Sequence, residues 1–322
     1  MPDTDTALIL HLQRLSTEDG PGLRTTVFFK GCPLRCSWCH NPESLAPHPQ
    51  TLWVETHCIG CERCLEACPN AALSRTPDGL IRIDRERCQG CGACAQACPT
   101  NAMELLGQRV TLDGLTAELL KDRAYFAQSD QGGVTASGGE PTLQAPFVAA
   151  LFARLHENSI HTTLDTCGAC PPSALAVILP HTDLVMFDLK LIDQAAHHRE
   201  TGQGNQRILQ NLLFISEQIQ AGRSQARIWI RTPLIPGATA TQANLSGIST
   251  FIHQHLDGLV QRWECCAFNN LCQDKYRRLG IAWQFESTPL MTPSMLDECQ
   301  SHALSGPFDP QRVLITGPTR TA

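Results

Sequence analysis

The chain has 322 residues, a formal net charge of −6 and 17 cysteines. The negative charge argues against a nucleic-acid-binding protein, and no apolar run approaches the roughly 20 residues that a membrane helix needs. The N-terminal stretch MPDTDTALILHLQ lacks the basic segment of a signal peptide, so we expect a cytoplasmic protein of about two domains. Clustered cysteines in that compartment bind metal or perform redox chemistry.

The first predicted strand, Thr25–Lys30, is followed directly by a loop with the cysteine spacing C-x3-C-x2-C. Its three cysteines are Cys32, Cys36 and Cys39. A closed zinc or iron–sulfur site takes four thiolates, whereas three thiolates hold three irons of a [4Fe–4S] cluster and leave the fourth iron open. Catalytic metal sites keep such an open position. The alternative is that a distant cysteine, such as Cys167 or Cys265, completes the site.

An internal repeat follows, in which the spacing C-x2-C-x2-C-x3-C-P occurs twice. This is the bacterial ferredoxin pattern, in which the fourth cysteine of each run binds the other cluster. One [4Fe–4S] cluster is therefore predicted on Cys58, Cys61, Cys64 and Cys98. The second is predicted on Cys88, Cys91, Cys94 and Cys68. Two zinc sites are the alternative, which two complete runs ending in Cys-Pro disfavour. Between the runs, a Pro-Asp-Gly turn inside alternating apolar and polar residues predicts a small hairpin.

The rest of the chain alternates strands and helices. The further predicted strands are Gly133–Ser137, His161–Asp165, Leu184–Leu189, Arg227–Arg231 and Gln261–Cys265. The predicted helices include Leu115–Gln128, Gln144–Asn158 and Arg207–Ala221. Polar motifs follow directly after strands, as they do at the carboxyl ends of the strands in parallel α/β barrels. We therefore predict an α/β fold: a partial parallel (β/α)6 barrel formed by residues 1–50 and 104–322, with a ferredoxin-like 2[4Fe–4S] domain inserted at 51–103.

Several motifs, in order along the chain, carry a resemblance to a known family. The three-cysteine loop, with the aromatic Trp38 before its last cysteine, resembles that of radical S-adenosylmethionine enzymes. More narrowly, DGPGLR (19–24), CHN (39–41), VTASGGEP (134–141), LDTCG (164–168) and VMFDLK (185–190) resemble the activating enzymes of glycyl radical enzymes, such as pyruvate formate-lyase activase. The paired ferredoxin runs resemble the longer subgroup of that family.

The resemblance implies that the open iron chelates the amino and carboxylate groups of S-adenosylmethionine. Reductive cleavage of the sulfonium would yield a 5′-deoxyadenosyl radical, which takes a hydrogen atom from one backbone glycine of a partner glycyl radical enzyme. A flavodoxin or ferredoxin would supply the electron. The alternative is a radical enzyme that acts on a small molecule or a peptide side chain. A plain ferredoxin-type electron carrier would explain only residues 51–103.

The resemblance also implies a set of residues that contact S-adenosylmethionine. They are Trp38, Gly138, Gly139, Glu140, Thr166, Asp188, Lys190, Arg231 and Asn269. The two glycines allow close backbone approach, and the Glu140 carboxylate suits the methionine ammonium group. A structural ion pair is the alternative for Arg231. Asn269 stands where pyruvate formate-lyase activase has a histidine, so it retains hydrogen bonding to a ribose hydroxyl without a titrating role.

Three further expectations concern the surroundings of that site. The resemblance implies a monovalent cation bound by Asp165, Thr166, the carbonyl of Met186 and Asp188; a pair of carboxylates without a metal is the alternative. It also implies that Asp19 approaches the glycine loop of the partner, although a Gly-Pro-Gly turn explains this Asp equally well. Arg24 either pairs with an anion or covers the barrel. Six cysteines have no predicted role: Cys167, Cys170, Cys265, Cys266, Cys272 and Cys299.

Overall fold

The computed structural model describes residues 4–319, and its body is one nine-stranded sheet of order β13-β12-β11-β10-β9-β8-β2-β1-β7. The strands are β1 (Thr6–Ser16), β2 (Arg24–Phe29), β7 (Gln108–Thr111), β8 (Gly133–Gly138), β9 (His161–Thr166), β10 (Leu184–Asp188), β11 (Arg227–Leu234), β12 (Val260–Ala267) and β13 (Val313–Thr316). From β2 to β13 every neighbouring pair is parallel, whereas β1 is antiparallel to β2 and β7. The order ends at β13 and β7, so the barrel is open.

All six predicted strands are confirmed, as β2, β8, β9, β10, β11 and β12, with small differences at their ends. The sequence reasoning missed the three strands that extend this parallel core. Two of them, β7 and β13, have four residues each and lie at the edges of the sheet. The third, β1, is exposed along much of its second half, so its apolar pattern is incomplete.

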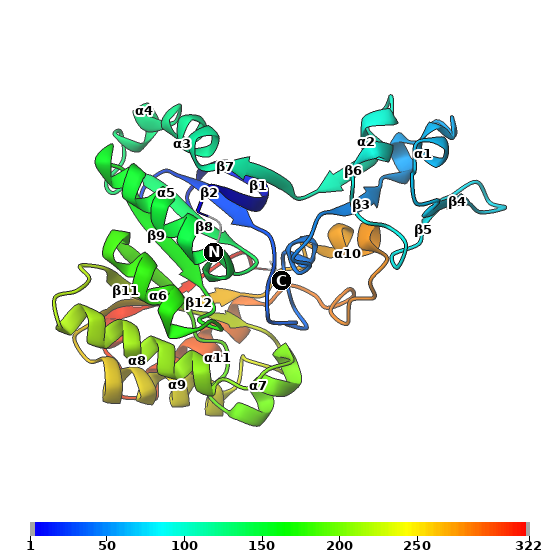
Figure 1. The fold of residues 1–322 in the computed structure, drawn as a ribbon. Coiled ribbons are helices and arrows are strands. Elements are labelled where there is room, and N and C mark those ends of the chain that lie inside the picture. The colour runs from blue at the N-terminus through cyan, green and yellow to red at the C-terminus, as the bar shows by residue number, and fades with distance from the viewer. Residues whose placement is uncertain (1–3, 320–322) are drawn as a thin grey trace.

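Helices cover one side of the sheet, as Figure 1 shows for α5, α6, α8, α9 and α11. The helices of the main body are α3 (Leu112–Leu120), α4 (Arg123–Phe126), α5 (Ala145–Glu157), α6 (Pro172–Ile178), α7 (Gln194–Thr201), α8 (Gln206–Gln220), α9 (Gln242–Leu256), α10 (Gln273–Leu279) and α11 (Pro293–Leu304). The short 3-10 helices are η1 (Pro42–Ser44), η2 (Glu55–His57), η3 (Pro141–Gln144), η4 (Leu179–His181) and η5 (Pro310–Arg312). Within residues 4–319, none of the helices has the length and apolar character required to cross a membrane.

Two of the predicted helices are confirmed as α5 and α8, but the predicted helix Leu115–Gln128 is wrong as one continuous element. It is divided into α3 and α4 at Asp122, which is buried. The Asp122 carboxylate accepts a hydrogen bond from Thr25 Oγ1 at 2.7 Å and pairs with Arg14. This tie to β1 and β2 holds Asp122 outside helical geometry, and the next helix begins after it.

The alternation of side chains along the strands separates an apolar face from a polar one. The residues that face the helices are fully buried and apolar, among them Phe29, Val134, Leu164, Phe187 and Ile230. The adjacent residues, which point to the inner face, are largely polar: Thr135, Asp165, Asp188, Arg231 and Glu264. The fold therefore places its ionisable side chains inside the open barrel, beside the loops at the strand ends.

The ferredoxin-like segment leaves the sheet after β2 and returns at β7. It is closed by the antiparallel pair β3 (Gln50–Trp53) and β6 (Met103–Leu106). Between them lie α1 (Arg63–Glu66), α2 (Ala93–Ala97) and the predicted hairpin, which is confirmed as β4 (Leu73–Arg75) and β5 (Ile81–Ile83). Figure 1 shows this segment extending away from the helix-covered sheet, with α10 beneath it. Its small core contains Cys64, Ile81, Cys94 and Met103.

Candidate functional site

The three-cysteine loop lies at the carboxyl end of β2, where the end of α7 fixes its first half. The Arg35 amide donates to the Thr201 carbonyl at 2.7 Å, and the Ser37 amide donates to the Glu200 carbonyl at 2.9 Å. Ser37 Oγ also donates to Glu200 Oε2 at 3.0 Å. These bonds satisfy the backbone of the first half of the loop, which is irregular and contains two of the three predicted ligands.

The second half of the loop is held by a C-terminal segment. Tyr276 Oη donates to the Cys39 carbonyl at 2.9 Å, and Trp283 Nε1 donates to the Ser37 carbonyl at 3.1 Å. Lys275 Nζ donates to the His40 carbonyl at 3.1 Å. The sequence reasoning missed these contacts because nothing local in the sequence connects this aromatic segment to a loop more than 200 residues earlier.

Burial disfavours ionisation of two of the loop thiols. It raises the pKa of Cys36 to about 11, and it also raises the pKa of Cys39. Buried thiolates therefore require a positive partner, which a bound iron supplies. The Lys190 ammonium contributes positive charge on the same side, since it interacts with the charge of Cys36.

Of the two cysteines considered as a distant fourth ligand, the structure brings only Cys167 to the loop. A hydrogen bond with the Cys167 thiol lowers the pKa of Cys32, and the same bond raises the pKa of Cys167 well above its ordinary value. The two thiols therefore lie close enough to influence each other's ionisation. Cys265 is fully buried in the helix-facing core, with Cys299 nearby. All 17 cysteines are unpaired.

The Gly-Gly-Glu segment after β8 packs against the start of the cysteine loop. A Cβ on Gly139 would lie 2.2 Å from the Gly31 carbonyl oxygen, and Gly138 has a φ of +109°. The glycines are therefore required for the close approach of β8 to the chain that enters the loop. This packing is enough to explain both glycines, without the close approach of a ligand that the sequence suggested.

The Glu140 carboxylate points into the protein, where it is fully buried. Its Oε1 accepts from Thr166 Oγ1 and from Thr142 Oγ1, both at 2.7 Å, and its Oε2 accepts from the Cys167 amide at 2.8 Å. These bonds fasten the end of β9 to the turn after β8. In this arrangement the carboxylate and the Thr166 hydroxyl are both occupied by the protein itself.

An ion-pair network occupies the inner face of the sheet beside the loop. Arg231 Nη1 lies 3.6 Å from Asp165 Oδ1, and Arg231 Nε lies 3.8 Å from Glu264 Oε2. Ser137 Oγ donates to Asp165 Oδ2 at 2.6 Å, and burial raises the pKa of Asp165 to about 7. Arg231 Nε is buried and has no hydrogen-bond partner within residues 4–319. The structural ion pair predicted as the alternative for Arg231 is thus present, and one buried donor remains for an anionic ligand.

The buried Lys190 forms a second ion pair with the half-buried Asp188 at the end of β10. Burial alone would lower the pKa of Lys190, but the negative charge of Asp188 and a hydrogen bond with its carboxylate raise it. The ammonium group is thus kept charged between the strand ends and the cysteine loop. This position suits the carboxylate of a small ligand bound at the loop.

The residues predicted to hold a cation are neighbours in the sheet. Asp165 is paired with Met186 in the parallel ladder between β9 and β10, and Met186 packs with Leu184 and Trp229. Over the described part of the chain, no three His, Cys, Asp or Glu side chains are grouped closely enough to hold one metal ion. A four-iron cluster differs, because its thiolates surround a cavity rather than a single point.

The loop after β12 lies beside the cysteine loop. His40 Nε2 is 3.1 Å from the Asn269 carbonyl oxygen, and Asn269 Oδ1 accepts from the Leu271 amide at 3.2 Å. Burial lowers the pKa of His40. Asn269 is thus placed next to the CHN motif. Trp38 is 5% exposed and belongs to the main hydrophobic core.

Asp19 and Arg24 are both engaged by the fold. Asp19 Oδ2 accepts from Ser16 Oγ at 2.6 Å and from Thr26 Oγ1 at 2.7 Å. The Arg24 guanidinium is fully buried and donates to Thr135 Oγ1 at 2.6 Å and to backbone carbonyls. For Arg24, the structure favours the interpretation that it covers the barrel.

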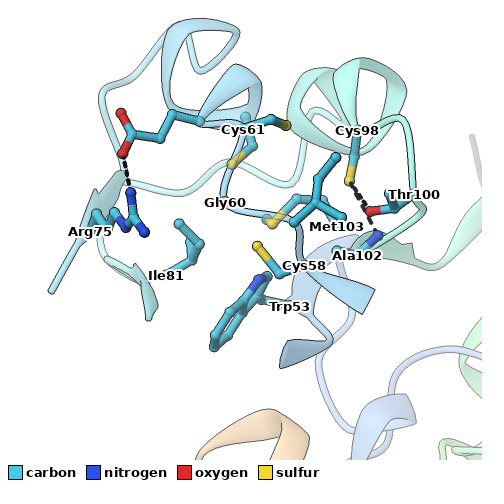
Figure 2. Close-up of a pocket in the computed structure, with 13 residues that line it drawn as sticks. Trp53, Cys58, Gly60, Cys61, Arg75, Ile81, Cys98, Thr100, Ala102 and Met103 are labelled. Atoms are coloured by element: carbon cyan, nitrogen blue, oxygen red, sulfur yellow. Dashed lines mark hydrogen bonds and ion pairs between the residues drawn. The ribbon is translucent and has the colours of Figure 1, made fainter. Parts of the chain in front are cut away.

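The insert brings together the four cysteines of the first predicted set. One pocket is lined by all four thiols of the first set, together with Trp53 and Met103 (Figure 2). In the second set, the sulfurs of Cys88 and Cys94 lie 3.6 and 3.8 Å from Thr51 Oγ1. The fourth cysteine of each run accepts a bond from the amide four residues later, Ala72 to Cys68 at 3.3 Å and Ala102 to Cys98 at 3.2 Å. The residues therefore fit two four-thiolate clusters.

Comparison with family models gives three matches. Residues 57–102 match a 4Fe-4S dicluster domain, residues 85–243 match the radical SAM superfamily, and residues 18–75 match a 4Fe-4S single cluster domain. The last of these ranges contains the three-cysteine loop.

Similar proteins extend over nearly the whole chain. The chain is 36% identical to the (2S)-3-sulfopropanediol dehydratase activating enzyme of Klebsiella oxytoca, over 89% of this chain and 90% of that protein. It is 39% identical to the trans-4-hydroxy-L-proline dehydratase activating enzyme of Clostridioides difficile, over 89% of this chain and 92% of that protein. A radical SAM methyltransferase from Sphaerobacter thermophilus has a similar fold, with a TM-score of 0.50 at 11% identity over 96% of this chain and 76% of that chain.

Proposed function

The chain belongs to the family of glycyl radical enzyme activating enzymes, and on this premise we propose how its residues divide the work. It is a radical S-adenosylmethionine oxidoreductase with iron–sulfur clusters. With S-adenosylmethionine bound, its catalytic cluster supplies the electron that cleaves the sulfonium and yields a 5′-deoxyadenosyl radical, which abstracts hydrogen from a glycine of the partner enzyme. The observation that carries the proposal is the three-thiol loop at the carboxyl end of β2, next to a buried lysine.

We assign three [4Fe–4S] clusters to the chain. The catalytic one is held by Cys32, Cys36 and Cys39, which leave one iron open. The two others are held by the two crossed cysteine sets of the insert. The four cysteines of the first set line one pocket. Residues 51–103 act as one inserted unit, and residues 1–50 and 104–322 form the barrel. The enzyme works in the cytoplasm.

Residues at the strand ends bind S-adenosylmethionine. The Lys190 ammonium, kept charged by Asp188, receives the methionine carboxylate. The backbone of Gly138, Gly139 and Glu140 receives the ammonium group, because the Glu140 side chain is bonded internally. The free N–H of Arg231 faces the inner side of the sheet and is available to the ligand. Trp38, Thr166, Asp188 and Asn269 complete the site, and Asn269 hydrogen-bonds the ribose.

A monovalent cation bound by Asp165, Thr166, Met186 and Asp188 would balance the buried acids beside this site. The raised pKa of Asp165 is consistent with a carboxylate that lacks a sufficient positive partner. Asp19 lies where the glycine loop of the partner approaches. Its carboxylate already accepts two internal bonds, so its backbone and the turn that follows make this contact.

We also propose that the two inserted clusters pass electrons from a flavodoxin or ferredoxin to the catalytic cluster. The exposure of Cys61 and Cys91 places one thiol of each predicted set at the surface. Replacing both residues and following reduction of the catalytic cluster with a physiological donor tests this relay. An undiminished rate would show that the insert serves docking or folding instead.

The overall proposal is tested anaerobically. The reconstituted protein is mixed with reductant, S-adenosylmethionine and candidate glycyl radical enzymes. A glycyl doublet in the EPR spectrum together with 5′-deoxyadenosine is expected. The second candidate function, a radical enzyme that acts on a small molecule or peptide side chain, predicts 5′-deoxyadenosine without a radical on any candidate.

A further inference from the structure

Strand β3 runs between the two predicted cluster sites of the insert. Its residues Thr51 and Trp53 are two positions apart, so their side chains point to the same face of the strand. Each of them lies against a different set of cysteines. One strand face is therefore shared between the two clusters.

Thr51 is 1% exposed, and its hydroxyl lies between two predicted ligands of one cluster. Thr51 Oγ1 is 3.6 Å from Cys88 Sγ and 3.8 Å from Cys94 Sγ. A cysteine that binds iron is a thiolate and accepts hydrogen bonds only. Once the cluster is bound, the Thr51 hydroxyl must therefore be the donor to one of these sulfurs.

Trp53 lies against the cysteines of the other predicted cluster, as Thr51 lies against Cys88 and Cys94. Its Nε1 is buried and has no hydrogen-bond partner in the described range 4–319. Figure 2 shows the indole nitrogen at the edge of the ring that lies beside Cys58, in the pocket that Cys64 and Cys98 also line. A buried N–H without a partner destabilises the protein. The sulfurs of a bound cluster are the acceptors that this pocket would contain.

We propose that β3 tunes the two inserted clusters separately, Trp53 through its N–H to a sulfur of the Cys58 cluster and Thr51 through its O–H to a sulfur of the Cys88 cluster. This inference rests on the cluster assignments proposed above. Hydrogen bonds to cluster sulfurs stabilise the reduced, more negative state and so raise the reduction potential. The backbone donors do not distinguish the two clusters, because the amides of Ala72 and Ala102 make equivalent bonds.

The test uses the full chain with the three catalytic cysteines replaced by alanine, so that only the inserted clusters titrate. EPR-monitored redox titration of this protein should resolve two one-electron steps. Trp53→Phe removes the N–H and retains an aromatic ring, whereas Thr51→Val removes the hydroxyl and retains the branched shape. We expect each substitution to move a different step to lower potential. A loss of about tenfold in the ratio of reduced to oxidised cluster corresponds to about 59 mV for one electron.

Matched controls separate hydrogen bonding from packing. Thr51→Ser keeps a hydroxyl, and Met103→Leu reshapes the pocket of Trp53 without removing a donor, so neither should shift its step appreciably. The iron content shows whether a negative result concerns the cluster assignments or only the tuning of the clusters. Less iron than two clusters in the parent protein would overturn the cluster assignments and the tuning with them. Full iron with unmoved steps, or with both substitutions moving the same step, would overturn the tuning alone.

Discussion

Cys167 lies beside Cys32, where interaction between the two thiols lowers the pKa of Cys32 and raises that of Cys167. The end of β9 thus brings a fourth cysteine to the edge of the three-cysteine loop. We predict that Cys167 is a neighbouring thiol and not an iron ligand. Cys167→Ala should therefore reconstitute a complete catalytic cluster whose EPR spectrum still changes when S-adenosylmethionine is added.

The measurement is iron content and EPR of the variant, with Cys299→Ala as a control for removing a buried thiol elsewhere in the core. If Cys167 completes the site, the variant loses iron, or S-adenosylmethionine changes the spectrum only after Cys167 is removed. Either result would show that the fourth iron is closed in the native chain.

A second prediction concerns the hydrogen bond that Tyr276 donates to the Cys39 carbonyl. Removal of the hydroxyl in Tyr276→Phe takes away one hydrogen bond to the loop, worth about 1 kcal/mol. Iron should then be released to a chelator about fivefold faster, in line with that energy. The other tyrosine of the chain, Tyr125, is 49% exposed, and Tyr125→Phe provides the matched control. Equal release rates in both variants would show that the C-terminal segment does not hold the loop.

A third prediction concerns Lys190 and the cofactor carboxylate. Lys190→Met should weaken S-adenosylmethionine binding by about tenfold or more, because hydrogen bonds to charged groups contribute about 1.5–3 kcal/mol. The dissociation constant is measured anaerobically by equilibrium dialysis. Lys121→Met removes a lysine whose side chain is 64% exposed and should leave binding unchanged. If both variants bind like the parent protein, Lys190 serves only its pair with Asp188.

A fourth prediction concerns pH and His161, at the amino end of β9. His161 lies between two guanidinium groups, 3.0 Å from Arg227 and 3.4 Å from Arg24. Burial, followed by the charge of Arg24, lowers the pKa of His161 to about 4. Between that value and its ordinary 6.5, the unfolded chain binds a proton that the folded chain does not. This contribution to stability therefore grows as pH rises from about 4 to 6.5 and is fully present above that window.

The thermal unfolding midpoint, measured across this window, checks the sign. His161→Asn should remove this part of the pH dependence, so that the difference between the variant and the parent protein changes with pH. His253→Asn, on the exposed side of α9, is the matched control for replacing a histidine. A constant difference for His161→Asn would mean that its ring binds protons equally in the folded and the unfolded chain.

Local patterns predicted much of the fold and of the metal chemistry. Most of the six core strands alternate apolar with polar residues, and the cysteine spacings determine which thiols can surround a cavity. Other features depend on residues far apart in the chain. The sequence does not reveal that Asp122 interrupts a helix to meet Thr25, or that Glu140 turns inward to hold Cys167. Tertiary contacts determine both the helix break at Asp122 and the orientation of Glu140, and they override what the neighbouring sequence favours.

The central claim is that this chain places a radical on a glycine of another protein. The most direct measurement is the EPR spectrum of the reconstituted, reduced protein with S-adenosylmethionine and a candidate glycyl radical enzyme, alongside an assay for 5′-deoxyadenosine. We predict a glycyl doublet that appears with the nucleoside and is absent when the target glycine of the candidate is replaced by alanine. Formation of 5′-deoxyadenosine with no protein radical on any candidate would contradict the claim.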